Sequence, residues 1–334
     1  MTTQEHKEEY KEEYNQDYIL TNLKKAANIH YIIRTECMGC LKPGMKYFDI
    51  VKNYEEEIKK YSSDNTGIAF PIGFSVNNIC AHDSSYQSDN RVLKKGDILK
   101  VDIGVHSNGY IIDSATTHVI DTPFEQLDDN TQNLIKSTRE ATNIAIKNSG
   151  VDARIYEISE LIYETITSYD GIQPIYALGG HNIKQYQIHA GKLILCKPHE
   201  IQKDMKMLEG EIYAVETFAS NRTGNIKELK DNKDTITHYM QKINNKNTEK
   251  YMKGYDISNF IKKRNMLPFN IYWSIDNKNS LKIKKEINDL CRLNIVEAYP
   301  AYTDVDNTAL TSQSEHTIFI KESNIEILSK FNDY

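Results

Sequence analysis

Two aspartates, Asp102 and Asp113, stand eleven positions apart in a stretch with the pattern of a β-hairpin. The flanking residues alternate between apolar and polar, and Ser107-Asn108-Gly109 between them is typical of a hairpin turn. A two-residue loop at this turn would pair Gly104 with Asp113 and place Asp102 diagonally opposite, about 7–8 Å away on the same face. Two carboxylates directed at one patch repel each other unless a cation lies between them. The hairpin therefore predicts a metal site, against the alternative of two acids on a solvated sheet face.

The same pattern recurs near position 210. The segment Gly210–Glu216 follows the order of Gly96–Asp102: each starts with Gly and an acid, continues as a β-type segment, and ends in a carboxylate. At a period of two, the final carboxylate of each copy shares a face with the residues two and four positions before it. This weak internal duplication predicts two similar halves that meet at a shared site.

Two further segments carry candidate ligands. The stretch GGHNIKQYQIHAG contains His181 and His189, and SQSEHTIFI contains Glu315 on an alternating, strand-like pattern. Asp, Glu and one His suit divalent ions such as Co, Mn, Fe(II) or Zn, whereas a structural zinc site usually needs Cys and His. Bridging carboxylates with one imidazole are typical of two ions about 3.5–4 Å apart.

The chain resembles the type II methionine aminopeptidases from about Asn22 to Tyr334. The resemblance rests on six segments in order: FPIGFSVNNICAH, KVDIG, IIDSATT, GGHNIKQYQIHAGK, EIYAVETFAS and SEHTIF. It implies an α/β (α+β) pita-bread fold, with two pseudo-symmetric halves around a central antiparallel sheet, which agrees with the internal duplication. It also implies removal of the N-terminal methionine from nascent proteins and peptides by a hydroxide activated at a dinuclear metal centre.

The resemblance implies two divalent metal ions per chain (Co, Mn, Fe(II) or Zn). The implied ligands are Asp102, Asp113, His181, Glu216 and Glu315. Asp113 and Glu315 would bridge both ions, Asp102 would complete one, and His181 with Glu216 would complete the other.

Two histidines, His82 and His189, match the catalytic histidines of the family that contact substrate. An apolar pocket would hold the methionine side chain beside them. The residues expected to bind substrate in this pocket are Phe70, Ile188, Phe218 and His238.

The long connection between Glu216 and Glu315 favours type II over type I. The two residues are 99 positions apart, whereas type I enzymes join the equivalent strands by a short connection. Residues 225–299 match the helical insert of type II enzymes, and the segment Leu281–Leu293 has mostly helical apolar spacing. We expect Leu281, Glu286, Ile287, Leu290 and Leu293 on one face of this helix.

We expect one catalytic domain over residues 19–334, preceded by a polar tail. Residues 1–18 lack apolar periodicity and are expected to be disordered. A helix should begin at Tyr18 and end before Pro43. Its apolar face would contain Ile19, Leu23, Ala26, Ala27, His30 and Ile33.

Composition narrows the partners and the compartment. The 334 residues carry a net charge of −6 and no dense basic patch, which argues against a nucleic-acid partner. No apolar run reaches the roughly 18 residues of a membrane-spanning helix, and five irregularly spaced cysteines suit a reducing compartment. We expect a monomeric cytoplasmic enzyme that acts on nascent polypeptides, with the ribosome as a candidate partner.

Two alternative functions remain open. An Xaa-Pro peptidase (prolidase or aminopeptidase P) shares the five ligands, although the long insert and the HAGK segment favour the methionine-specific class. A non-catalytic pita-bread binding protein would keep the fold and lose ligands. Retention of all five argues against it, because buried carboxylates without a metal would cost stability.

Overall fold

The computed structural model describes residues 3–229, 236–242, 250–275 and 279–330. At its centre is the expected hairpin, formed by β4 (Ile98–Ser107) and β5 (Tyr110–Val119). Ser107 pairs with Tyr110 and Gly104 pairs with Asp113, which confirms the predicted register. The two loop residues, Asn108 and Gly109, have φ angles of 49° and 80°, as the tightest hairpin turns require.

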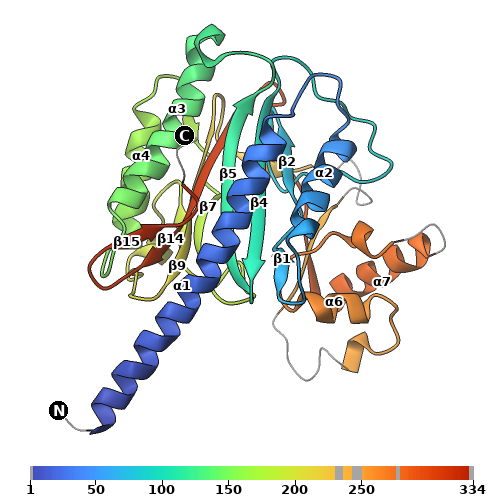
Figure 1. Cartoon of the computed structure of the whole chain (residues 1–334). Coiled ribbons are helices and arrows are strands. Elements are labelled where there is room, and N and C mark those ends of the chain that lie inside the picture. Colours follow the sequence, from blue (N-terminus) through green and yellow to red (C-terminus); the bar gives the residue numbers. More distant parts are fainter. Residues whose placement is uncertain (1–2, 230–235, 243–249, 276–278, 331–334) are drawn as a thin grey trace.

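The first half of the molecule is an antiparallel sheet covered by two helices (Figure 1). The strand order is β1-β4-β2, with β5 paired to the same β4. The first-half elements besides the hairpin are α1 (Thr3–Met38), α2 (Tyr47–Lys60), β1 (Thr66–Ile68), β2 (Gly73–Val76) and β3 (Ile79–Ala81).

The second half repeats this plan with another antiparallel sheet and two more helices (Figure 1). The strand order is β15-β14-β9-β7-β8, and β6 also pairs with β9. Its helical elements are η1 (Phe124–Gln126), α3 (Asp129–Lys147), α4 (Ile155–Thr167) and η2 (Glu200–Gln202). Its strands are β6 (Gln173–Pro174), β7 (Gly179–Ile183), β8 (Leu193–Leu195), β9 (Ile212–Ser220), β14 (Thr311–Ile320) and β15 (Ile325–Ile327). The two halves confirm the predicted pita-bread architecture.

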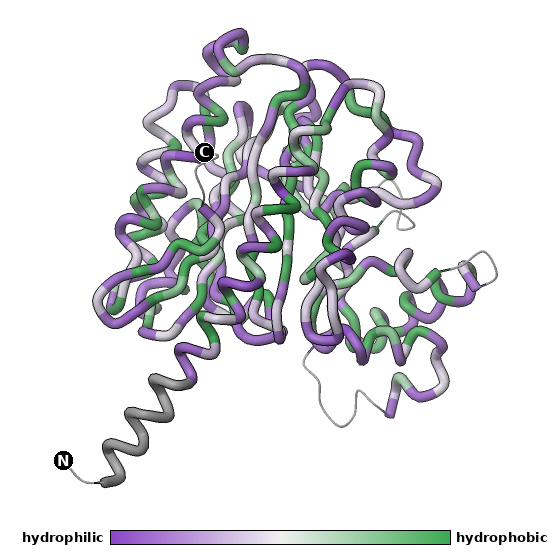
Figure 2. Tube along the Cα trace, viewed as in Figure 1, coloured by the Kyte–Doolittle hydropathy of each residue, from purple (hydrophilic) through white to green (hydrophobic). Residues whose placement is uncertain are grey.

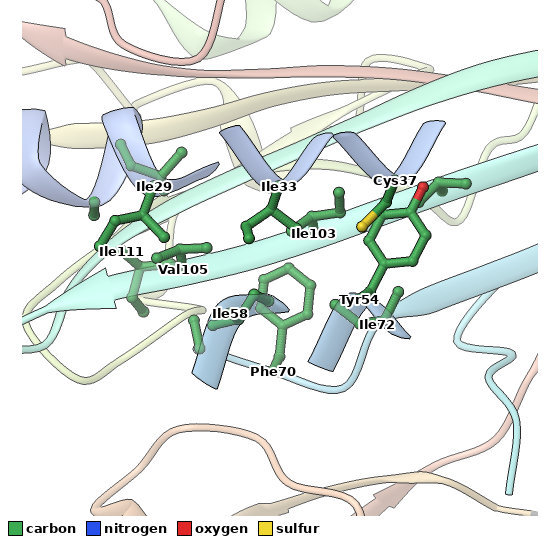
Figure 3. Packing of buried hydrophobic residues seen from close by; sticks show 14 of the residues in the cluster. Ile29, Ile33, Cys37, Tyr54, Ile58, Phe70, Ile72, Ile103, Val105 and Ile111 are labelled. Carbon is green, nitrogen blue, oxygen red and sulfur yellow. The ribbon is translucent and has the colours of Figure 1, made fainter. Parts of the chain in front are cut away.

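Each half has its own hydrophobic core between helices and sheet. In the first half, Ile29 and Ile33 of α1 lie against Ile103 and Val105 of β4 (Figure 3). These β4 residues alternate with Asp102 and Gly104, so the carboxylate faces away from the helices. Hydrophilic and hydrophobic residues alternate along α1 where it crosses the sheet (Figure 2).

The apolar face predicted for α1 is buried as expected, but the predicted start of the helix is wrong. Leu23, Ala26, His30 and Ile33 are all fully buried. The helix begins at Thr3 rather than at Tyr18, and so continues through the segment expected to be disordered. The Glu, Lys and Gln residues of this segment have high intrinsic helix propensity, which does not depend on an apolar face.

The insert between β9 and β14 has a third hydrophobic core of its own. Its helices and strands are β10 (Ile226–Glu228), β11 (His238–Gln241), α6 (Ser258–Arg264), η4 (Ile271–Trp273), α7 (Ser280–Arg292), β12 (Val296–Tyr299) and β13 (Tyr302–Asp304). Parts of the predicted insert, residues 230–235, 243–249 and 276–278, lie outside the described residues.

The predicted helix of the insert exists as α7, but its buried face is rotated from the one we expected. Glu286, Ile287 and Leu290 are buried as predicted, and Glu286 Oε2 accepts a hydrogen bond from the Ile257 backbone. Leu281 is 87% exposed and Leu293 is 49% exposed, and Ile283 is buried instead. The buried residues Ile283, Glu286, Ile287 and Leu290 have the i, i+3, i+4, i+7 spacing of one helical face, whereas Leu281 lies about 200° around the helix from Ile283.

A search of the described helices for a membrane span found none that is long and apolar enough to cross a bilayer.

Candidate metal centre and peptide site

Five side chains from five strands converge between the two halves. Asp102 and Asp113 come from the β4–β5 hairpin, and His181, Glu216 and Glu315 come from β7, β9 and β14. They form two groups of three residues. Within each group, one potential ligand atom from each residue lies within 4.8 Å of the other two. One group is Asp113, His181 and Glu315, and the other is Asp102, Glu216 and Glu315.

Strand pairing explains why the second half contributes its three ligands to one place. Glu216 and Glu315 are direct partners in the β9–β14 ladder, and His181 pairs with Ala214, two residues before Glu216. Glu315 belongs to both groups, so its carboxylate has the position that a bridging ligand needs. The division of the other ligands between two ions stays a prediction.

The four carboxyl groups strongly favour their protonated forms in the absence of a cation. Burial raises the pKa of Asp102 to about 7. Burial, and then the neighbouring carboxylates, raise the pKa values of Asp113, Glu216 and Glu315 well above their usual range. Burial lowers the pKa of His181 far below its usual value, so its imidazole is neutral and able to act as a ligand.

The donor set fits divalent cations. Asp102 Oδ1, Asp113 Oδ1 and Glu315 Oε2 are buried and have no hydrogen-bond partner within the described protein. Buried polar atoms are nearly always paired, so three orphaned carboxylate oxygens in one cluster indicate a missing positive partner. The oxygen-rich set with one imidazole suits Mn, Fe(II), Co or Zn.

The loop that follows β3 presents His82 to this cluster. His82 has a φ of 62°, an unusual conformation for a residue with a side chain. The next residue, Asp83, accepts hydrogen bonds from both Nη1 and Nη2 of Arg91, and the Arg91 side chain also contacts Asp89. This ion network holds the loop, and burial lowers the pKa of His82 to about 4, so its ring is neutral near pH 7.

A second histidine, His189, lies beside the ligand His181. Its ring centroid is 4.4 Å from that of His181 in an edge-to-face arrangement. His189 is exposed to the cavity. Desolvation lowers its pKa, so it also presents a neutral ring.

One cavity of about 490 Å³ contains the metal-ligand side chains and both histidines. The four residues expected to bind the methionine side chain all line it: Phe70, Ile188, Phe218 and His238. His238 lies on β11 of the insert, 5.8 Å from His82 between ring centroids, and its Nε2 is 3.2 Å from the Pro71 carbonyl oxygen. The insert therefore supplies part of the cavity wall.

The sequence reasoning missed Gln313, Tyr299 and Tyr302. Gln313 Nε2 donates a hydrogen bond to Glu216 Oε1 at 2.6 Å and a long one to Asp102 Oδ2 at 3.5 Å. It stands two residues before Glu315, so a period of two could have placed it on the ligand face. Tyr299 and Tyr302 line the cavity from the end of the insert, each less than 6 Å from His82 between ring centroids, and no local pattern in the sequence marks them.

A glycine behind Phe70 sets the width of the cavity. A Cβ at Gly104 would lie 2.2 Å from Phe70 Cε1, so Gly104→Ala should push the Phe70 ring towards the substrate. We expect a loss of about 1–3 kcal/mol of stability from overpacking. We also expect a loss of at least about 10-fold in kcat/KM for a Met-Ala-Ser peptide, because small misplacements of positioning groups have large kinetic effects. Gly150→Ala is the matched control, since nothing lies within 4 Å of its added Cβ. Equal kinetics for the two variants would contradict this role of Gly104.

Comparisons with known proteins agree with this geometry. Residues 21–254 match the model of metallopeptidase family M24. A methionine aminopeptidase 2 from Dictyostelium discoideum is 35% identical over 100% of this chain and 75% of its own length. The fold is similar to that of a thermophilic Arx1 (TM-score 0.76, 20% identity, covering 95% of this chain and 91% of that one). It is also similar to that of a methionine aminopeptidase from Thermotoga maritima (TM-score 0.63, 20% identity, covering 92% and 95%). The extent of the family match and of the 35% identity shows that this chain belongs to metallopeptidase family M24.

Proposed function

We propose that the chain is a type II methionine aminopeptidase, which removes the N-terminal methionine from nascent proteins and peptides. The observation that carries the proposal is that one cavity combines the five-ligand cluster, three neutral histidines and an apolar wall. The type II assignment is supported by the insert, whose His238 and Met240 line the same cavity, and by the relatives named methionine aminopeptidase 2.

Asp102, Asp113, His181, Glu216 and Glu315 would hold the ions. Two divalent ions bound there would supply a nucleophile at neutral pH and polarise the scissile carbonyl group. Glu315, which belongs to both ligand groups, would bridge the ions together with Asp113, while Asp102 would complete one ion and His181 with Glu216 the other. Gln313 would keep the carboxylates of Glu216 and Asp102 in place through its amide N–H groups.

His189 and His82 would act directly on the peptide. A neutral imidazole of His189, beside the ligand His181, can donate a hydrogen bond to the carbonyl oxygen as negative charge develops on it. His82 lines the same cavity, where its neutral ring can orient the peptide and transfer a proton to the leaving amine. The positive φ of His82 and the clamp of Arg91 on Asp83 fix the direction of this ring.

The apolar wall would select the first side chain. Phe70, Ile188, Phe218 and His238 surround a space that suits an unbranched apolar side chain such as that of methionine. A pocket of this kind excludes larger side chains by shape, although it discriminates weakly among side chains of similar size.

Peptide selectivity tests the proposal against the Xaa-Pro alternative. We expect Met-Ala-Ser to be cleaved at least about 100-fold more efficiently than Phe-Pro or Arg-Pro peptides, because a side chain that does not fit the apolar wall cannot place its carbonyl group at the ligand cluster. The measurement is kcat/KM for the three peptides with Mn²⁺-loaded protein. Faster turnover of Phe-Pro or Arg-Pro would establish the prolidase-like function, and binding of Met-Ala-Ser without turnover would support a non-catalytic binding protein.

The proposed substrate also implies a place and partners. Nascent polypeptides carry their first methionine at the ribosome, so we propose that the chain acts in the cytoplasm, as a monomer, near the ribosome. The net charge of −6 supports a protein substrate rather than a direct nucleic-acid partner.

A further inference from the structure

The two halves of the molecule meet along β5 and β14, which lie side by side (Figure 1). Among the described residues, β5 forms ladder pairs with β4, and β14 forms them with β9 and β15. The two strands therefore belong to different sheets, although β5 carries Asp113 and β14 carries Glu315. What holds these two strands at a fixed spacing also sets the spacing of the two carboxylates.

Side-chain hydroxyl groups take the place of a backbone ladder at this junction. Thr317 Oγ1 accepts a hydrogen bond from the Asp113 backbone N–H at 2.8 Å and donates one to the Asp113 carbonyl oxygen at 2.6 Å. Thr117 Oγ1 makes the same two bonds to the backbone of Gln313, at 2.9 and 2.8 Å. Ser114 Oγ adds a bond to the Glu315 carbonyl oxygen at 2.8 Å. We call these five bonds the hydroxyl seam.

The seam is reciprocal between the halves. Thr117 on β5 binds the backbone of Gln313 on β14, whose side chain contacts the ligands Glu216 and Asp102. Thr317 on β14 binds the backbone of the ligand Asp113 on β5. In each case one hydroxyl satisfies both an N–H and a C=O group, as a residue of a neighbouring strand would do in a ladder. Thr117 and Thr317 are themselves buried, 3% and 0% exposed, so water cannot readily replace these bonds.

The seam lies directly behind groups that repel one another. The carboxylates of Asp113 and Glu315 are both buried, belong to one group of potential ligands within 4.8 Å, and each has an oxygen atom without a hydrogen-bond partner among the described residues. Repulsion between them would tend to separate β5 from β14, and the hydroxyl seam opposes that separation through bonds to the backbone of the ligand strands.

We propose that Thr117 and Thr317 are positioning residues that fix the spacing of Asp113 and Glu315 across the junction and thereby set the affinity for metal. This inference rests on the proposed metal centre. Neither hydroxyl group touches a cation or the substrate; each acts through the backbone of Asp113 or Gln313. Residues that orient ligands in this way typically contribute about 10–100-fold to metal affinity.

Valine substitutions test the proposal, because valine has nearly the shape of threonine and lacks the hydroxyl group. We expect Thr317→Val to weaken Mn²⁺ binding about 10–100-fold in calorimetric titration of the metal-free full-length chain, with a smaller loss for Thr117→Val. Thr317→Ser keeps the hydroxyl group and should restore most of the affinity. At saturating Mn²⁺, Thr317→Val should regain most of its kcat towards Met-Ala-Ser, because the metal then supplies the missing constraint.

A matched control separates positioning from general stability. Thr66 on β1 is a buried threonine whose Oγ1 accepts a hydrogen bond from Lys25 Nζ at 3.1 Å and lies 3.4 Å from Ser107 Oγ, neither of which belongs to the seam. Thr66→Val should lower the melting temperature while leaving Mn²⁺ affinity unchanged. If Thr317→Val does not fold, Ser114→Ala removes one seam bond and should weaken Mn²⁺ binding to a lesser degree.

Three results would overturn the inference. If the folded valine variants bind Mn²⁺ as tightly as the wild type, the seam has only a structural role. If Thr317→Val does not fold, wild-type affinity in Ser114→Ala leads to the same conclusion. An equal loss of affinity in Thr66→Val would lead to the same conclusion. If the wild-type chain binds no Mn²⁺, the proposed metal centre itself is wrong. Titration of the wild type alone gives this result, so it is distinguished from a failure of the seam proposal.

Discussion

The Asp113→Asn protein is expected to fold, and its kcat/KM for Met-Ala-Ser is expected to be more than about 100-fold lower than that of the wild type. The carboxylate of Asp113 is buried, lies among the ligand groups of the cluster and has an orphaned oxygen. An amide keeps the shape of the side chain but carries no negative charge and can offer only one oxygen. Residues that merely hold ligands contribute about 10–100-fold, so loss of a ligand itself should cost more. The measurements are kcat/KM and Mn²⁺ binding by calorimetry.

Asp121→Asn is the control for this substitution. Asp121 lies just after β5 and its exposed carboxylate is 3.7 Å from Lys95 Nζ, so the variant removes the same charge from the surface. We expect its activity and Mn²⁺ affinity to match those of the wild type, since exposed ion pairs contribute little. Full activity of Asp113→Asn, with Asp121→Asn unchanged, would refute the assignment of Asp113 as a metal ligand.

The four carboxyl groups of the cluster are expected to contribute less and less to the stability of the metal-free protein as the pH rises from about 4 to 7 and above. Burial raises the pKa of Asp102 from 3.8 to about 7, and the pKa values of Asp113, Glu216 and Glu315 are also raised. Over this range these four groups bind more protons in the folded state than in the unfolded state, so their contribution to the free energy of unfolding falls as the pH increases. Stability from these groups is therefore fully present below their unfolded pKa values and is lost as the pH rises towards their folded values.

Mn²⁺ should reverse this trend, because its charge offsets the ionised carboxylates. At a free concentration about 1,000 times the dissociation constant, a bound ion adds about 4 kcal/mol to the free energy of unfolding. Urea unfolding at pH 5, 6 and 7, with chelator and with Mn²⁺, measures both effects. Glu216→Gln removes one of the raised carboxyl groups, so the stability of the metal-free wild type relative to this variant should fall between pH 5 and 7. A difference between the two proteins that stays constant over this range would contradict the proposed electrostatics of the cluster.

Much of the candidate site follows from local rules. The turn at Asn108 and Gly109 sets the register of the β4–β5 hairpin, and the period of two then places Asp102 and Asp113 on one face. The same period places Glu216 and Glu315 on the strands that pair directly. The apolar face of α1 could be predicted as well, because its spacing is that of a single long helix.

The remaining features depend on which surfaces meet, and no local pattern encodes that. Tyr299 and Tyr302 reach the cavity because β12 and β13 return the chain beside His82.

The sequence by itself determined the five candidate ligands, the hairpin that carries two of them and the two-half architecture, because turn chemistry and strand periodicity act over a few residues. Only the tertiary structure decided how the halves are joined. Thr317 and Asp113 are 204 residues apart, and Thr117 and Gln313 are 196 apart, so their hydrogen bonds exist only after both sheets have formed. The physical reason is that a hydroxyl group can form hydrogen bonds with many different groups. Tertiary packing determines which of these groups lies within hydrogen-bonding distance.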